Sequence, residues 1–185
     1  GDRLKILFIT NAFTRSSTRE RFDITGINSE DKNLFLDSGS TTRERIARGS
    51  YTFDIFGGAQ DIEIGAERAQ TILDSKLALG VRRNSGTPSD AVGGLVPVAV
   101  SNANSSVEEI RVEPFIIHNW IFSPRMSLET SVLYEDSEIT QRGDVAKKRD
   151  FDFIKPKIDF RYDLTPTIQL RGTIEKIVEQ LSFSD

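Results

Sequence analysis

Apolar and polar residues alternate over two long runs between Glu109 and Glu138, and a tight turn, Ser123-Pro124-Arg125, separates the runs. Side chains that alternate every second residue predict strands, so the segment predicts a β-hairpin. Its arms exceed the about 5 to 6 residues of an ordinary globular strand and reach the roughly 9 to 11 that a tilted membrane-spanning strand needs. The expected apolar face carries Ile110, Val112, Pro114, Ile116, His118, Trp120 and Phe122, then Leu128, Thr130, Val132 and Tyr134.

The same alternation predicts five further strands, which makes about seven in all. They cover residues 2–13, 42–56, 61–79, 150–163 and 168–178. In the third of these five stretches the apolar parity switches after Ala66, which predicts a β-bulge near Glu67 and Arg68.

Short turns and long polar loops alternate between these strands. The turns are Gly57-Gly58, Ser123-Pro124-Arg125 and Leu164-Thr165-Pro166, and the expected loops are 25–40, 80–106 (with a short strand within 95–100) and 141–149. Outer-membrane barrels have short periplasmic turns and longer extracellular loops. The pattern therefore predicts an all-β antiparallel meander, a partial transmembrane β-barrel. Aromatic residues near the turns fit an interfacial girdle, namely Phe56, Trp120, Phe122 and Tyr162.

Composition excludes some classes of protein but does not decide between a soluble β-protein and a membrane barrel. The 185 residues are 37% hydrophobic and 28% charged, and a mean hydropathy of -0.32 is compatible with a barrel, whose strands alternate. The chain has no run of about 18 apolar residues that would form a transmembrane helix. A net charge of -4 and the lack of a basic stripe argue against a nucleic-acid partner. Zero cysteines exclude disulfides and thiol catalysis.

Candidate chemistry is sparse. His118 is the single histidine and falls on the apolar face between Ile116 and Trp120, which favours an interfacial role over a catalytic triad. With one His and no Cys, we expect no metal site, no cofactor and no catalytic residue, and the chain contains no nucleotide-binding or nucleophile-elbow motif. The ligand-binding residues are unknown, and the expected protein is not an enzyme.

Carboxylates recur on the polar faces and could in principle form a glycosidase pair. Basic residues accompany them on the same or neighbouring strands, so we expect a lumenal network of ion pairs instead. The carboxylate pairs are Glu63 and Glu67, Glu109 and Glu113, Glu129 and Glu135, and Glu175 and Glu179, and the basic residues are Arg111, Lys155, Lys157, Arg161 and Arg171.

Several stretches together give the chain a resemblance to a family. They are Arg43-Glu-Arg-Ile-Ala-Arg-Gly, Asp61-Ile-Glu-Ile-Gly-Ala-Glu-Arg-Ala with Leu73-Asp74-Ser75, Val107-Glu-Glu-Ile-Arg-Val-Glu-Pro-Phe, Ser127-Leu-Glu-Thr-Ser-Val-Leu-Tyr-Glu, Phe153-Ile-Lys-Pro-Lys and Val178-Glu-Gln-Leu-Ser-Phe. Over nearly its whole length, the chain resembles the barrel region of TonB-dependent outer-membrane receptors of proteobacteria.

The resemblance implies a transporter in the bacterial outer membrane that imports a scarce nutrient, such as a metal chelate, a cofactor or an oligosaccharide. Such receptors have a barrel of about 22 strands closed by a plug, so residues 1–185 would be one segment of that wall, with no plug domain. The implied partners are outer-membrane lipid, the remaining barrel strands and plug of the parent receptor, and the energy-coupling TonB protein. The alternative is a soluble antiparallel β-sandwich or small barrel that binds a ligand or a partner.

Overall fold

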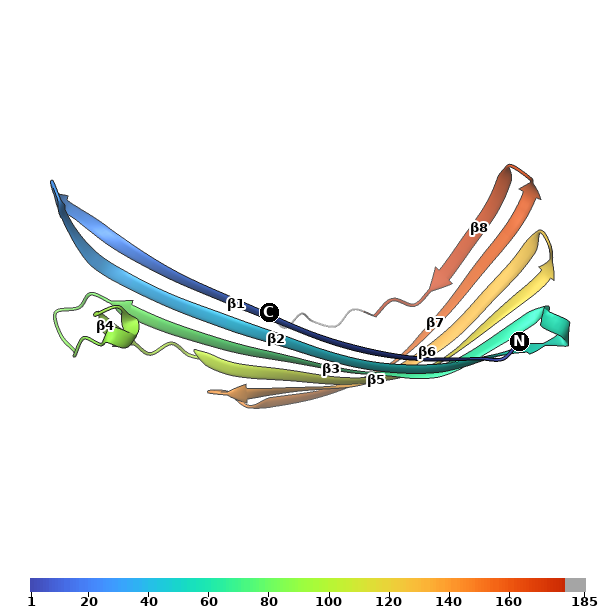
Figure 1. The fold of residues 1–185 in the computed structure, drawn as a ribbon, viewed down its shortest axis with the longest axis horizontal. Helices are drawn as coiled ribbons and strands as arrows, with labels where there is room; N and C mark the ends of the chain where they lie inside the picture. Colours follow the sequence, from blue (N-terminus) through green and yellow to red (C-terminus); the bar gives the residue numbers. More distant parts are fainter. Residues whose placement is uncertain (179–185) are drawn as a thin grey trace.

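The computed structural model describes residues 1–178, which form one curved antiparallel sheet (Figure 1). Seven strands follow each other as a meander in the order β1-β2-β3-β5-β6-β7-β8, and the short β4 pairs with β3. The predicted all-β meander is therefore confirmed, and the sheet curls into a half-barrel. The strands are β1 (Arg3–Gly26), β2 (Ser29–Ile55), β3 (Gln60–Val81), β4 (Val96–Val98), β5 (Asn104–Ser123), β6 (Met126–Gly143), β7 (Lys147–Thr165) and β8 (Ile168–Glu175), with single turns of 3-10 helix at η1 (Phe56–Gly58) and η2 (Asp90–Val92).

The strand register separates the side chains into two faces, as the alternation predicts. Trp120 pairs with Leu128, and Leu128 pairs with Phe160, so these three share one face. Arg111 pairs with Ser137 on the other face, with no bulge between Arg111 and Trp120. We call the first face the outer face and the second the inner face. The expected separation is confirmed: Ile110, Val112, Ile116, Trp120, Ile158, Phe160, Ile168, Leu170 and Ile174 lie on the outer face, and Lys155, Lys157, Arg161, Arg171 and Glu175 lie on the inner face.

Two of the three predicted long loops are wrong. Residues 25–40 form a hairpin in which Gly26 pairs with Ser29 across the two-residue turn Ile27-Asn28, and β2 continues from there. Asn28 has φ 60°, a left-handed conformation that Asn tolerates. Residues 141–149 likewise belong to β6 and β7 apart from 144–146. Their polar residues remain in strands because cross-strand pairs bind them, as in the hydrogen bond from Thr18 to Asp37 at 2.8 Å.

The predicted loop at 80–106 is present in shortened form, between Val81 and Asn104, and its expected short strand is β4. Part of this loop packs on the far ends of β2 and β3. Val92 and Leu95 are among the few buried apolar side chains, at 5% and 9% exposure. A Cβ added at Gly80 of β3 would lie 2.8 Å from the Val92 Cβ, so the loop needs a glycine at this contact.

The predicted bulge near Glu67 and Arg68 is also wrong. The register of β3 runs without a shift against both β2 and β5. The parity switch has a different cause: the outer face of β3 changes from apolar (Ile62, Ile64, Ala66) to polar at Arg68, while buried Ala69 lies on the inner face. The strand β3 therefore continues in register, and the face that carries its apolar residues changes at Arg68.

The described residues form a single layer with very little core. Their buried apolar side chains are Ala69, Val92, Leu95 and Phe115. The chain exposes 12816 Å², whereas a compact monomer of its mass, 20.7 kDa, exposes about 8,900 Å². No second sheet covers either face among residues 1–178. Within the same range, no helix is long and apolar enough to cross a bilayer.

Candidate functional site

An apolar band crosses the outer face of the sheet. On β3 and β7 it occupies only part of the length: β3 is apolar outward from Ile62 to Ala66, and β7 from Ile154 to Tyr162. The stretch on β7 matches the roughly 9 to 11 residues of a tilted membrane strand. The band's large exposed side chains are Leu4, Ile6, Phe8, Tyr51, Ile64, Val112, Ile116, Trp120, Phe122, Val132, Tyr134, Ile154, Ile158, Tyr162, Ile168, Leu170 and Ile174.

Charged residues end the band at the side remote from the short turns. The next outer positions are Arg68 on β3, Asp136 on β6 and Asp152 on β7, and all three are exposed. The strands continue well beyond them, since β2 runs for 27 residues and β3 for 22. The strands β2 and β3 therefore have a limited apolar section and a longer polar extension.

Aromatic side chains gather at the turn side of the band, as the sequence predicts. The rings of Trp120 and Phe122 stack at 3.9 Å between centroids, and His118 lies 6.2 Å from Trp120. His118 Nε2 hydrogen-bonds Gln60 Oε1 at 2.9 Å, so its contacts are an aromatic ring and an amide. Amphipathic rings at one level of a sheet are typical of a membrane interface.

The inner face carries a chain of ion pairs that crosses five strands. Arg48 of β2 lies 3.5 Å from Glu67 of β3, and Arg111 of β5 lies 3.7 Å from Glu67 and 3.1 Å from Glu113. Lys155 of β7 continues the series, 3.9 Å from Glu113 and in an ion pair with the buried Glu135 of β6. The three basic and three acidic groups balance each other.

Contacts beneath this chain of ion pairs hold it in place. The Arg48 guanidinium lies 4.4 Å from the ring centroid of buried Phe115, a cation–π geometry. Gly65 allows the approach, because a Cβ there would meet Phe115 at 2.5 Å.

The predicted carboxylates all lie on the inner face, with one exception that the structure does not cover. Glu67, Glu113 and Glu135 join the ion-pair chain, while Glu63, Glu109, Glu129 and Glu175 occupy inner positions elsewhere. Glu179, and the stretch that follows Val178, lie outside the described residues.

Three basic residues of β7 and β8 have partners that the sequence did not indicate. Lys157 pairs with Asp159 at 2.6 Å and Arg161 with Asp163 at 2.8 Å, each two residues along the same strand. Arg171 donates to Gln169. Residues two apart on a strand share a face, and that signal could have identified both aspartates.

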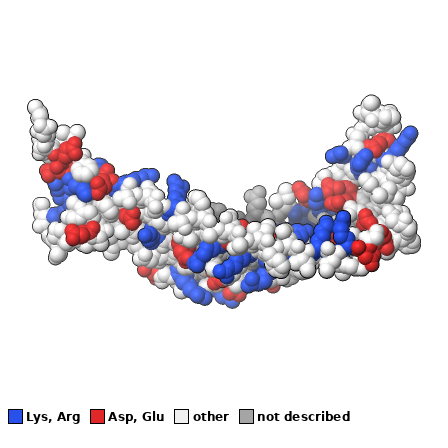
Figure 2. Space-filling view, viewed as in Figure 1, with Lys and Arg blue, Asp and Glu red and all other residues white. Residues whose placement is uncertain are grey.

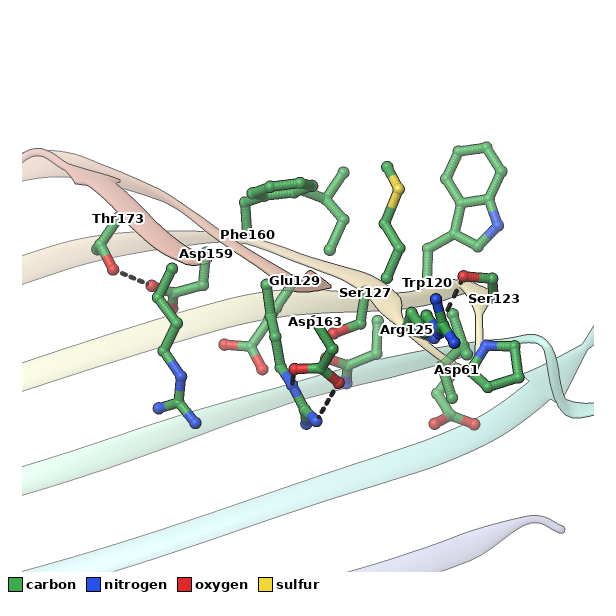
Figure 3. A pocket seen from close by; sticks show the side chains of 17 residues that line it. Asp61, Trp120, Ser123, Arg125, Ser127, Glu129, Asp159, Phe160, Asp163 and Thr173 are labelled. Atoms are coloured by element: carbon green, nitrogen blue, oxygen red, sulfur yellow. Dashed lines mark hydrogen bonds and ion pairs between the residues drawn. The ribbon is translucent and has the colours of Figure 1, made fainter. Parts of the chain in front are cut away.

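A hollow of about 720 Å³ opens at the turn end of the sheet (Figure 3). In that view Asp61, Glu129 and Asp159 point to the side opposite Trp120 and Phe160. Thr173 donates to Asp159 at 2.5 Å, and the remaining inner side chains are mostly charged or polar. Such a surface suits a polar solute or a polar protein segment. The inner residues that line the hollow are Asp61, Asn119, Ile121, Ser127, Glu129, Asp159, Arg161, Asp163, Arg171 and Thr173.

Residues 1–178 contain no group of three or more His, Cys, Asp or Glu side chains that could hold a metal ion. Figure 2 shows basic and acidic side chains interspersed along the visible face. No protein-family model matches the sequence, and comparison with curated proteins gives no significant match.

Proposed function

We propose that the chain is a section of the wall of a bacterial outer-membrane β-barrel, in which the outer face contacts lipid and the inner face lines the lumen. The observation that carries this proposal is the apolar band, whose height on β7 fits a bilayer while the strands continue beyond it. In a soluble protein such a band needs a second apolar layer, and residues 1–178 supply none. Lipid is the partner that fits.

The inner face supports the same assignment. A lumenal wall contacts water, so charged side chains are stable there, whereas charges on the lipid side are costly. Arg111, Glu113 and Lys155 lie directly behind apolar outer positions such as Val112 and Ile154. The inner charges also pair with one another, which limits the free energy lost on their partial burial.

The two edges of the sheet support a larger barrel. β1 and β8 end the strand order and do not pair with each other. An open edge presents unpaired N–H and C=O groups, which a spanning sheet cannot leave in lipid. We infer that further strands complete the ring. Eight strands already close a narrow barrel, so an open arc of seven belongs to a wider one.

Within this class we propose a TonB-dependent receptor that imports a metal chelate, a cofactor or an oligosaccharide. The support is the resemblance of the stretches 43–49, 61–69, 107–115 and 127–135 to the barrel region of that family. On this proposal a plug and the TonB protein are partners, and the hollow near Asp159 is a lumenal surface that faces the plug or the nutrient.

The decisive experiment places the same new charge on each face. Ile158→Arg puts a guanidinium on the outer face, where lipid contact costs about 2 to 4 kcal/mol near the midplane. Thr173→Arg puts it on the inner face beside Asp159, one residue from Ile174, the partner of Ile158. In the full-length protein, heat-modifiable mobility and surface labelling should show failed assembly for the first variant and normal assembly for the second.

Equal assembly of both variants would contradict the proposal that the outer face contacts lipid. Extraction into buffer without detergent would favour the soluble alternative. The receptor class has its own readout, because nutrient uptake by the wild-type protein should disappear in cells that lack TonB. Uptake that persists in those cells would contradict the assignment to TonB-dependent receptors, while the proposal of an outer-membrane barrel would still stand.

A further inference from the structure

Two arginines project from the outer face at the edge of the apolar band. Arg68 of β3 pairs in register with Ala47 of β2, and Arg45 is the next outer residue of β2 beyond Ala47. Arg45 and Arg68 are therefore diagonal neighbours, whose Cα atoms lie about 7–8 Å apart in an antiparallel sheet. Both are exposed. Side chains of this length can meet over a single ligand.

Neither arginine forms an ion pair with a carboxylate of residues 1–178, which distinguishes them from the arginines around them. Arg43, two residues along the same face, pairs with Asp74, and Arg48 of the inner face pairs with Glu67. Two neighbouring like charges repel each other. The arrangement therefore favours an anion that both guanidinium groups can bind.

The surface between the two arginines is hollowed. A groove of about 350 Å³ is lined by Phe8, Thr10, Arg45, Ala47 and Arg68 of the outer face and by Ile9 and Ile46, which lie between them in the chain. Along β1 the groove changes from the apolar Phe8, which belongs to the band, to the hydroxyl of Thr10 beyond it. The groove thus has an apolar side and a cationic side, and the change coincides with the end of the band.

We propose that Arg45 and Arg68 bind the phosphate of an anionic lipid headgroup, with the acyl chains of that lipid on Phe8 and the band below it. This inference rests on the proposed membrane assignment. Guanidinium groups bind phosphate oxygens through paired N–H donors, and each basic residue near a membrane surface attracts anionic lipid. On the same face Asp136 and Asp152 oppose each other across β6 and β7, so an anion is attracted to β2–β3 and repelled from β6–β7.

The test is native mass spectrometry of the full-length protein in detergent micelles doped with phosphatidylglycerol or with phosphatidylcholine. The wild type should retain phosphatidylglycerol in preference to phosphatidylcholine, and Arg45→Gln with Arg68→Gln should lower that preference about 30-fold. The matched control is Arg15→Gln with Arg19→Gln, which makes the same change in net charge on inner-face positions of β1. It should retain the lipid as the wild type does. Added salt should weaken retention by the wild type.

The outcomes separate this inference from the proposed function. If the Arg45/Arg68 variant assembles in the membrane and keeps its lipid preference, the lipid site is wrong and the barrel stands. If inorganic phosphate displaces the lipid at equal concentration, the pair binds free anions and the lipid assignment fails. If the wild type never enters the membrane, the proposed function fails before the lipid is tested.

Discussion

At the scale of single residues, the inner face combines charge with partial burial. Glu135 is 1% exposed, and Lys155 reaches it from the neighbouring strand while also lying 3.9 Å from Glu113. Removal of one member from a buried pair leaves its partner charged in a poorly solvated place, and that loss exceeds the net stabilisation the pair provides. The surface pair of Lys148 and Glu138, at 2.8 Å, lacks this penalty because water reaches both groups.

Lys155→Met should therefore lower the free energy of unfolding by about 3 kcal/mol. A second change, Glu135→Gln, should restore part of the loss because it removes the isolated charge. Urea titration of the full-length protein in lipid measures both effects. Lys148→Met is the control, with little expected change, and equal losses for the two lysine variants would contradict the burial of the inner network.

Acid should affect the polar extension of β2 and β3 through Asp31. Arg82 donates to this carboxylate at 2.9 Å and lowers its pKa below the usual 3.8. Because the folded pKa is the lower one, the stabilisation is complete above the unfolded value and is lost as the pH falls through the folded value. The protection of backbone amides near Asn28 against hydrogen exchange should decrease below about pH 3.8. Asp31→Asn should remove that pH step, and a step of unchanged size would assign it to another group.

At the scale of elements, the strands extend far beyond the apolar band because polar cross-strand contacts replace apolar packing. On the β1–β2 hairpin, Lys32 pairs with Glu20 at 2.6 Å and Arg21 donates to Asn33 at 2.8 Å. Such contacts are weak one by one, so the two-residue turn must hold the register of the hairpin end. Asn28, at φ 60°, occupies the position of that turn with the strictest backbone requirement.

Asn28→Gly should leave the hairpin intact, and Asn28→Val should destabilise it by about 1–2 kcal/mol, since a β-branched residue is strained in the left-handed region. Limited proteolysis of the hairpin end compares the two variants. Equal resistance would mean that the turn does not set the register.

The loop between Val81 and Asn104 should behave as a separate packing unit. Gly80→Leu places a side chain against Val92 and Leu95, so it should release the loop and speed its proteolytic cleavage. Assembly of the barrel should persist, because the contact lies beyond the apolar band. Gly49→Ala is the control, as a Cβ there meets nothing within 4 Å.

Where one side of a strand is apolar, the sequence predicted the strand, its place in the sheet and the face of each side chain. In such strands the apolar side avoids water, so apolar residues recur at every second position. Its errors are at polar strands such as 29–40, where Ser, Asn and Asp are as typical of a loop as of a solvated strand. The supposed bulge at Glu67 shows a second limit, because a strand that leaves the band changes its apolar side without any change of register. The links of Arg111 to Glu67 and of Lys155 to Glu135 join different strands, so they depend on a register that one sequence does not specify.

At the scale of the whole molecule, residues 1–178 form one curved layer with two open edges, and such a layer cannot bury its own apolar surface. The strand β1 presents an unpaired edge along Arg3–Gly26 (Figure 1). Long open edges invite pairing with other chains, and the exposed band adds a hydrophobic attraction. Lipid and neighbouring strands would satisfy both.

The chain of residues 1–185 by itself should aggregate in aqueous buffer and disperse in detergent. Light scattering with and without micelles measures this difference, and circular dichroism should show strand in both cases. A monodisperse monomer in buffer would contradict the need for lipid and support a soluble module.

On the proposed membrane assignment, the abrupt end of the apolar band also fixes the depth of the wall in the bilayer. The outer face turns charged at Arg68, Asp136 and Asp152 on three separate strands. A displacement of the wall by two residues along its strands, about 7 Å, would submerge charges on all three. A barrel built from this wall would therefore keep the same depth in membranes of different thickness, and a bilayer that mismatches the band would have to thin or thicken around it.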